Sequence, residues 1–119
     1  MDAANLTTIR QRYERILERI AIAARKSNRE AEDIQLVVVT KLHSAESIRE
    51  VIAAGARHLG ENYADQALPK IDVLRVLPGI HWHMIGHVQS RKAGIVAKEF
   101  DFIHSLDSLK LAEKLDRYC

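Results

Sequence analysis

The stretch LVVVTKLHSAESI, residues Leu36–Ile48, joins an apolar run to a helical pattern through a threonine and a lysine. The run from Leu36 to Val39 is continuous and mostly β-branched, which is typical of a strand buried on both faces in a parallel sheet. Ser44 is a favourable helix N-cap, and an apolar helical face follows it up to Gly55. The stretch therefore predicts a strand followed by a helix, with Lys41 where the strand ends.

The pattern of a strand followed by a helix occurs four times along the chain. The predicted strands are 36–40, 57–60, 81–85 and 102–104, and the predicted helices that follow them are 44–54, 63–77, 90–98 and 108–119. One further helix, with Asn5 available as its N-cap, precedes the first strand. Because a proline costs about 3 kcal/mol inside a helix, we expect a break or kink at Pro69. Alternating strands and helices predict the α/β class, with a parallel sheet and right-handed crossovers.

The chain length narrows the choice of α/β architecture. A (β/α)8 barrel of the TIM type needs about 250 residues, and this chain has 119. Four consecutive βα units with an N-terminal helix therefore suit half of such a barrel, and a small open sheet is the alternative. The last helical pattern still continues at Cys119, without a cap, so we expect a chain that has been cut.

Composition excludes several classes of partner. With 47% hydrophobic and 29% charged residues, residues 1–119 should form one soluble globular domain. The formal net charge is +2, without a basic block, so nucleic acid is not an expected partner. No apolar run approaches the roughly 18 residues of a membrane span, and the N-terminus lacks the apolar core of a signal peptide. We therefore expect a cytoplasmic protein that does not enter a membrane.

Four segments resemble a known family, and they do so in the same order along the chain. They are LVVVTK (36–41), ARHLGENYADQALPKI (56–71), IHWHMIGHVQSRK (80–92) and FDFIHSLDSLKLAEKL (100–115). Together they resemble the N-terminal half of the pyridoxal phosphate homeostasis protein family, whose members resemble the barrel domain of alanine racemase. The resemblance implies half of a barrel that binds pyridoxal phosphate (PLP), in a carrier or buffer of the free cofactor. It does not imply an enzyme, and we expect no catalytic turnover.

The resemblance also implies where the cofactor binds. By position in the family motifs, Lys41 forms an imine with PLP, and the GEN motif at 60–62, residues 82–86 and the pair at 104–105 line the cofactor side. The cofactor-binding residues carried over in this way are Lys41, Asn62, His83 and Ser105. The chain departs from the family after the lysine: it has Leu42, His43 and Ser44 where the family usually has threonine, lysine and proline. The loop over the cofactor is therefore expected to differ.

Physical chemistry gives Lys41 two alternative roles. A lysine amine attacks a carbonyl only when it is neutral, so an imine requires a site that lowers the lysine's pKa by desolvation or by neighbouring positive charge. Side chains alternate along a strand, so Lys41 should share a face with Val37 and Val39. The alternative is a lysine that only extends into solvent from the strand end. The family resemblance favours the imine.

Other residues near the strand ends also have alternative roles. The amide of Asn62 suits either a cofactor oxygen or the N-cap of the helix that follows. Glu61 suits a structural ion pair with an arginine. His81, His83 and His87 suit zinc ligands, which makes a metal-dependent hydrolase the alternative function. No carboxylate lies close by in sequence to support such ligands.

One expected part of a PLP site is missing. In eight-stranded barrels the phosphate is usually held by the loops after the last two strands, which four βα units do not contain. We therefore expect weak binding, unless a second copy supplies the missing half. Half a barrel also leaves two sheet edges and an apolar inner face exposed, which predicts a homo-oligomer formed through those edges.

Overall fold

The structure is a computed structural model that describes residues 8–119. Its order of elements is the predicted one. The elements are α1 (Ile9–Lys26), η2 (Ala31–Asp33), β1 (Val38–Val39), α2 (Ala45–Ala53), β2 (His58–Glu61), α3 (Ala64–Leu74), β3 (His81–Met84), η3 (Ser90–Lys92), α4 (Ala93–Glu99), β4 (Phe102–Ile103) and α5 (Leu109–Tyr118). Thr8 caps α1 through a capping box with Gln11. The predicted cap, Asn5, lies outside the described residues.

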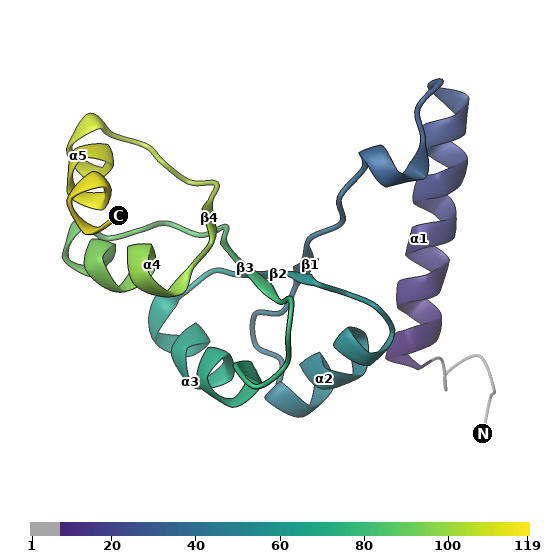
Figure 1. Cartoon of the computed structure of the whole chain (residues 1–119), viewed down its shortest axis with the longest axis horizontal. Coiled ribbons are helices and arrows are strands. Elements are labelled where there is room, and N and C mark those ends of the chain that lie inside the picture. The colour runs from purple at the N-terminus through teal and green to yellow at the C-terminus, as the bar shows by residue number, and fades with distance from the viewer. Residues whose placement is uncertain (1–7) are drawn as a thin grey trace.

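The four strands form one parallel sheet in the sequential order β1-β2-β3-β4. Val39 pairs with Gly60, Gly60 with His83, and His83 with Phe102. Figure 1 shows α2 and α3 below the sheet, α4 and α5 at one end and α1 at the other, with the opposite side of the sheet open. Sequential parallel strands with helices on one side are the arrangement of half a (β/α)8 barrel, so the predicted fold class is confirmed.

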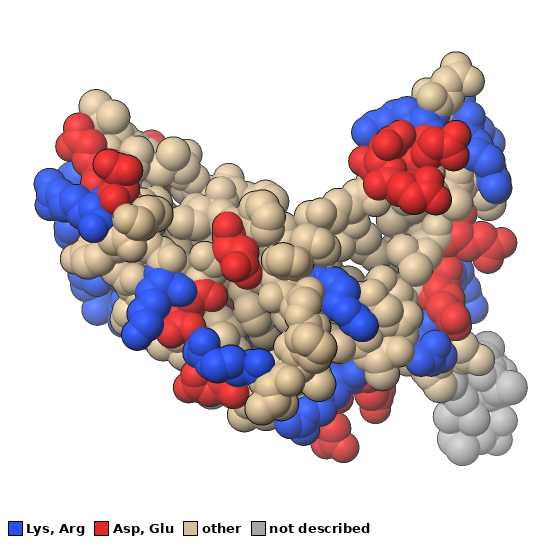
Figure 2. Space-filling view, viewed as in Figure 1, with Lys and Arg blue, Asp and Glu red and all other residues tan. Residues whose placement is uncertain are grey.

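The two faces of the sheet differ in burial because side chains alternate along each strand. Leu59, Trp82 and Met84 point toward the helices and are buried there in the main hydrophobic core. Val39 and Phe102 lie on the other, inner face, and each remains 45% exposed. Figure 2 shows that the hollow between the two raised ends of the molecule is lined mainly by uncharged residues. The hydrophobic core therefore lies between sheet and helices, and the inner face is left open.

The predicted break at Pro69 is wrong, because Pro69 lies inside the continuous helix α3. Its side chain is exposed, whereas Ala67, Ile71 and Leu74 of the same helix are buried in the core. Packing of these three residues outweighs the loss of one helical hydrogen bond at the proline. The first strand is also shorter than predicted, and it is an edge strand that pairs only with β2.

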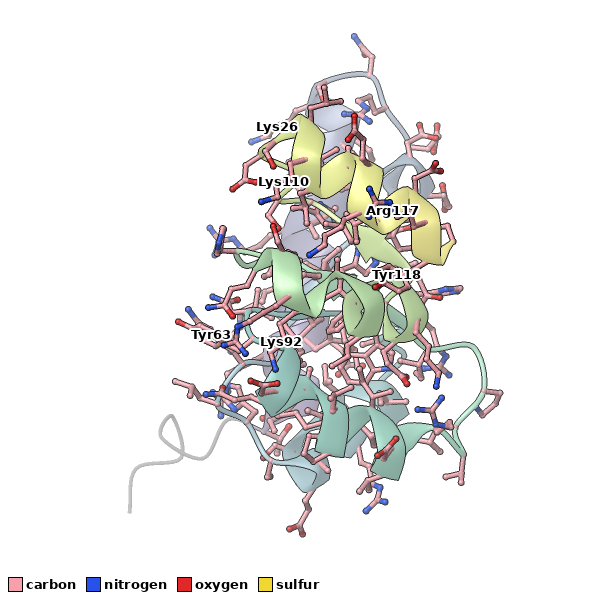
Figure 3. All side chains as sticks on the ribbon, turned by 90° about the vertical axis from the view of Figure 1, so that its left-hand side faces the viewer. Lys26, Tyr63, Lys92, Lys110, Arg117 and Tyr118 are labelled. Carbon is pink, nitrogen blue, oxygen red and sulfur yellow. The ribbon has the colours of Figure 1, made fainter. Side chains whose placement is uncertain are left out.

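The C-terminal helix α5 packs on α4, the helix of the preceding βα unit. Tyr118 of α5 lies over α4 (Figure 3). A Cβ atom added to Gly94 of α4 would lie 3.1 Å from the ring of Tyr118. The glycine thus allows the two helices to approach closely. None of the helices in residues 8–119 is long and apolar enough to span a membrane.

Candidate functional site

Lys41 lies in a tight turn at the carboxyl end of β1. The N–H of His43 donates to the carbonyl oxygen of Thr40 at 3.1 Å, which closes the turn and places Lys41 and Leu42 at its two central positions. Leu42 is 82% exposed and has a φ of 64°, the left-handed region that a leucine rarely adopts. Lys41 is exposed, and its ammonium has no hydrogen bond or ion pair within residues 8–119. The turn therefore presents an unpaired amine at the sheet edge.

The loops that follow β2, β3 and β4 are joined at the same edge. A Cβ atom on Gly86 would lie 2.1 Å from the carbonyl oxygen of Asn62, so the backbones after β2 and β3 touch. The hydroxyl of Ser105 donates a short hydrogen bond to the carbonyl oxygen of Gly86, which ties in the loop after β4. Lys41, Asn62 and Ser105 thus all lie at the carboxyl edge of the sheet, as predicted. Asn62 is not the cap of α3, whose N-cap is Tyr63 without a side-chain cap bond.

His83, the fourth predicted residue, lies within β3 rather than beyond its end. Its side chain is only 1% exposed, in the layer of the sheet that contains Val39, Gly60 and Phe102. Its ring stacks on Phe102, with a centroid distance of 4.4 Å and an interplanar angle of 11°. His83 therefore sits one layer below the carboxyl edge, beneath the other three residues.

Three imidazoles form a hydrogen-bonded chain across the inner face. Nδ1 of His58 lies 2.9 Å from Nε2 of His83, and Nδ1 of His83 lies 2.8 Å from Nε2 of His104. We call His58, His83 and His104 the imidazole chain. Because each contact needs one donor and one acceptor, the neutral chain must carry its protons in one direction along its length. Both ring nitrogens of His83 are thus already bonded within the protein.

The imidazole chain disfavours positive charge. Burial lowers the pKa of His83, and the neighbouring His58 and His104 lower it further. Burial also lowers the pKa of His58, with a smaller decrease from His81 and an opposing increase from Asp101. The lowered pKa values favour the neutral form of His58 and His83.

The predicted zinc ligands do not come together. His81 stacks on His58 at a centroid distance of 4.8 Å, and His83 is held in the imidazole chain. His87 lies in the following loop, where its Nδ1 is 3.4 Å from a carboxylate oxygen of Asp107. No three His, Cys, Asp or Glu side chains in the described part of the chain are grouped so that they could hold a metal ion. The structure thus contradicts the alternative of a metal-dependent hydrolase built on these histidines.

The helix-facing side of the same edge holds a buried ion pair that was not predicted. The Nζ atom of Lys70 in α3 lies 3.1 Å from both carboxylate oxygens of Glu61, and the Glu61 side chain is only 1% exposed. The expected arginine partner of Glu61 is therefore a lysine. The hydroxyl of Thr40 donates a short hydrogen bond to the same carboxylate, and Lys70 also donates to the carbonyl oxygen of Thr40 at 3.0 Å. Strand alternation predicts part of this arrangement, because Glu61 lies two residues after Leu59 and therefore points to the same, helix-facing side of the sheet.

A cavity of about 220 Å³ opens beside the loops after β2 and β3. Its lining includes Tyr63, His87, Arg91 and Lys92. Tyr63 and Lys92 lie next to each other in Figure 3, and Lys92 is paired with Asp65 at 2.9 Å. The cavity combines an aromatic ring with basic side chains near the carboxyl edge.

Comparison with known proteins supports the predicted family. No protein-family model matches the chain. A pyridoxal phosphate homeostasis protein of Pseudomonas aeruginosa is 39% identical over 110 residues, which are 92% of this chain and 47% of that protein. One of Escherichia coli K12 is also 39% identical, over 103 residues that are 85% of this chain and 44% of that protein.

Solved structures agree with the sequence matches. PipY of Synechococcus elongatus, solved with PLP bound, is 46% identical, with a TM-score of 0.73, over 87% of this chain and 47% of that one. A structure of an unknown protein from Bifidobacterium adolescentis has a TM-score of 0.85 at 35% identity and covers 98% of this chain and 51% of that one. These matches confirm the resemblance predicted from the sequence. The chain is thus a relative of the pyridoxal phosphate homeostasis proteins, and it spans about half the length of the relatives that it matches.

Proposed function

We propose that this chain binds PLP through an imine of Lys41 and takes part in the homeostasis of that cofactor. The observation that carries the proposal is the position of Lys41, in the turn that ends β1 at the carboxyl edge of a half barrel, in a relative of a protein solved with PLP bound. In barrels of this type the sites gather at that edge. The amine attacks the aldehyde carbon, a C=N bond forms, and water is released.

The other residues at the edge shape the site around Lys41. We propose that Asn62 and Ser105 contact the cofactor from the loops after β2 and β4, since both lie at the same edge as Lys41. The buried His83 supports this layer from below, because its two ring nitrogens already bond His58 and His104. A direct contact between His83 and the cofactor would require one of these bonds to open.

We propose a carrier or buffer without catalytic turnover, acting in the cytoplasm. The relatives are named for homeostasis of the cofactor, which supports a role without turnover. Racemisation of alanine above the uncatalysed background would overturn this part of the proposal. Cell fractionation tests the location.

We also propose that residues 1–119 form one domain, equivalent to the N-terminal half of the barrel, and that copies associate through the β1 and β4 edges. Both are edge strands within the described sheet, and each carries a half-exposed apolar residue on the inner face, Val39 and Phe102. Exposed strand edges next to apolar surface favour pairing with another chain. A second copy would cover the open inner face.

Covalent trapping of the imine tests the main proposal. The purified chain is incubated with PLP and reduced with borohydride, and intact mass and peptide mapping then locate the added cofactor. We expect one adduct on the peptide that contains Lys41 and none in the Lys41→Ala variant. Lys110, an exposed lysine on α5, provides the matched control: Lys110→Ala should keep the adduct. Equal labelling of wild type and Lys41→Ala would show that Lys41 is only a solvated lysine without a role in binding PLP.

A further inference from the structure

The residue before Lys41 is fixed through every polar group it has. The Thr40 N–H donates to the carbonyl oxygen of Gly60 at 2.9 Å, and its hydroxyl donates to the Glu61 carboxylate. Its carbonyl oxygen accepts from Nζ of Lys70 at 3.0 Å as well as from the N–H of His43 at 3.1 Å. Thr40 is also buried. The carboxyl end of β1 is therefore anchored to β2, α3 and its own turn at once.

The anchor begins where strand pairing ends. β1 contains only Val38 and Val39, and it is paired on one side only. So short an edge strand cannot by itself define the direction in which the chain leaves the sheet. The turn that follows contains Leu42 in a left-handed conformation. Because this conformation is unfavourable for a leucine, it favours rearrangement of the turn. Something other than the β ladder must hold this turn in place.

We infer that Glu61 and Lys70 are positioning residues for Lys41, which they hold in place through the side chain and the carbonyl group of Thr40. This inference rests on the proposed function of Lys41 for its biological meaning, and it adds two residues on the opposite face of the sheet. Glu61 orients the Thr40 hydroxyl and neutralises Lys70. Lys70 in turn donates to the carbonyl group that closes the turn.

The chemistry of the pair explains why neither member can be removed without effect. Glu61 is almost fully buried, and the side chain of Lys70 is 13% exposed. Removing one partner leaves the other as an uncompensated buried charge, which shifts toward solvent or draws in water. Either response displaces the Thr40 hydroxyl or carbonyl group to which it was bonded. The displacement reaches Lys41 through one peptide bond.

The test measures the stability of the turn and the affinity of Lys41 for PLP separately, in the intact chain. The variants are Glu61→Gln, which keeps the shape and removes the charge, and Thr40→Val, which removes only the hydroxyl. Thr40→Ser keeps the hydroxyl and serves as the conservative rescue. Glu99→Gln is the matched control, because Glu99 forms a partly buried ion pair with Arg75 of similar length, 3.0 Å, far from this turn in sequence. Circular dichroism confirms folding of each variant.

Two readouts decide the inference. The first is amide hydrogen exchange at His43 and Thr40, whose N–H groups bond within the anchor, compared with Ala54 at the end of α2. We expect faster exchange at His43 and Thr40 alone in Glu61→Gln and Thr40→Val. The second is the affinity of Lys41 for PLP, followed by the visible absorbance of the imine. We expect about a tenfold loss in both variants, the value of one hydrogen bond to a charged group, and wild-type affinity in Thr40→Ser and Glu99→Gln.

The outcomes separate this inference from the proposed function. If the wild type forms no imine at Lys41, the proposed function fails, and hydrogen exchange at His43 still decides whether Glu61 and Lys70 hold the turn. If the wild type forms the imine, and Glu61→Gln and Thr40→Val bind PLP with unchanged affinity and unchanged exchange at His43, the inference is overturned. If Glu61→Gln does not fold, Thr40→Val decides alone, because it leaves the ion pair in place.

Discussion

The backbone of Gly86 lies directly against the backbone of Asn62, so that a Cβ atom on Gly86 would fall 2.1 Å from the Asn62 carbonyl oxygen and 2.7 Å from its Cα. Both distances are far below van der Waals contact, and the obstructing atoms belong to the main chain, which cannot rotate away. The carbonyl oxygen of Gly86 also accepts the hydroxyl of Ser105. One glycine thus joins the three loops at the carboxyl edge.

Gly86→Ala should therefore separate the loops after β2 and β3. We expect a loss of about 1–3 kcal/mol in the free energy of unfolding, the usual range for overpacking, together with weaker imine formation at Lys41. Urea unfolding and imine absorbance measure the two effects. Gly94→Ala is the control, because the three atoms nearest to its new methyl group all belong to the ring of Tyr118, a 58% exposed side chain that can move, and alanine is the better helix former. An equal loss in both variants would contradict the special role of Gly86.

A substitution of Leu42 should raise the free energy of unfolding rather than lower it. Its φ of 64° costs about 1–2 kcal/mol for a residue with a Cβ atom, and its exposed side chain contributes little burial in return. Asparagine tolerates this conformation, so Leu42→Asn should raise the free energy of unfolding by about 1 kcal/mol. Leu42→Ala lacks the short polar side chain with which asparagine hydrogen-bonds locally in this conformation, and should give no such gain. Urea unfolding measures the free energy of unfolding of both variants. Equal values for Leu42→Asn and Leu42→Ala would contradict the strain at Leu42.

Strand alternation and N-cap residues made most of this fold predictable from the sequence. Alternating strands and helices determined the parallel order, and Ser44 and Ser108 cap their helices through their side chains. The continuous helix through Pro69 was not predictable, because tertiary packing of its buried face decides it. The left-handed conformation of Leu42 has no local signal, since leucine does not favour it.

The candidate site was predictable to the level of the sheet edge, but not to its contacts. Three of the four predicted residues lie at that edge because parallel strands end on the same side. The imidazole chain depends on strand register, which places His58 and His104 diagonally on either side of His83. The Glu61–Lys70 pair depends on how α3 packs against β2, which single-sequence patterns do not specify.

The imidazole chain predicts a fall in stability on acidification. The pKa values of His58 and His83 are lowered in the folded protein, whereas an unfolded histidine has a pKa of about 6.5. Below about pH 6.5 the unfolded chain therefore binds protons that the folded chain does not bind. The free energy of unfolding should drop by up to about 1.4 kcal/mol per pH unit for each such proton, and these two groups add no dependence well above that pH.

Urea unfolding at pH 5, 6 and 7 measures this dependence. Besides burial, which lowers both pKa values most, His58 and His104 lower the pKa of His83, His81 lowers the pKa of both rings, and Asp101 opposes these effects. His58→Gln keeps a polar side chain but removes one of the two histidines with a lowered pKa, so its stability should fall less steeply between pH 7 and pH 5. A slope as steep as that of the wild type would exclude His58 as a source of the pH dependence.

Association through the sheet edges predicts a concentration-dependent mass. Sedimentation velocity across a range of concentrations should show species larger than the 13.5 kDa monomer. Val39→Lys adds a charge to the β1 edge and should shift the chain toward the monomer. Val76→Lys changes a valine that is 82% exposed after α3 and should leave the association unchanged. A wild type that stays monomeric at all concentrations would contradict the proposed edge contact.

The phosphate group of the cofactor gives the last prediction. The described residues contain four βα units, whereas barrels of this type usually hold a phosphate with the loops after the last two of eight strands. Contacts to a phosphate are charge-assisted hydrogen bonds, roughly twice as strong as neutral ones, so their loss should weaken binding and leave the imine easily hydrolysed on dilution. Pyridoxal without its phosphate should then bind Lys41 almost as well as PLP.

Titration of wild type with both aldehydes, read by imine absorbance and compared with Lys41→Ala, measures the ratio of the two affinities. A large preference for PLP would show that an anion site exists in this half or in a second copy. Repeating the titration with Arg91→Ala, at the basic cavity beside the carboxyl edge, would then test the first of these two locations.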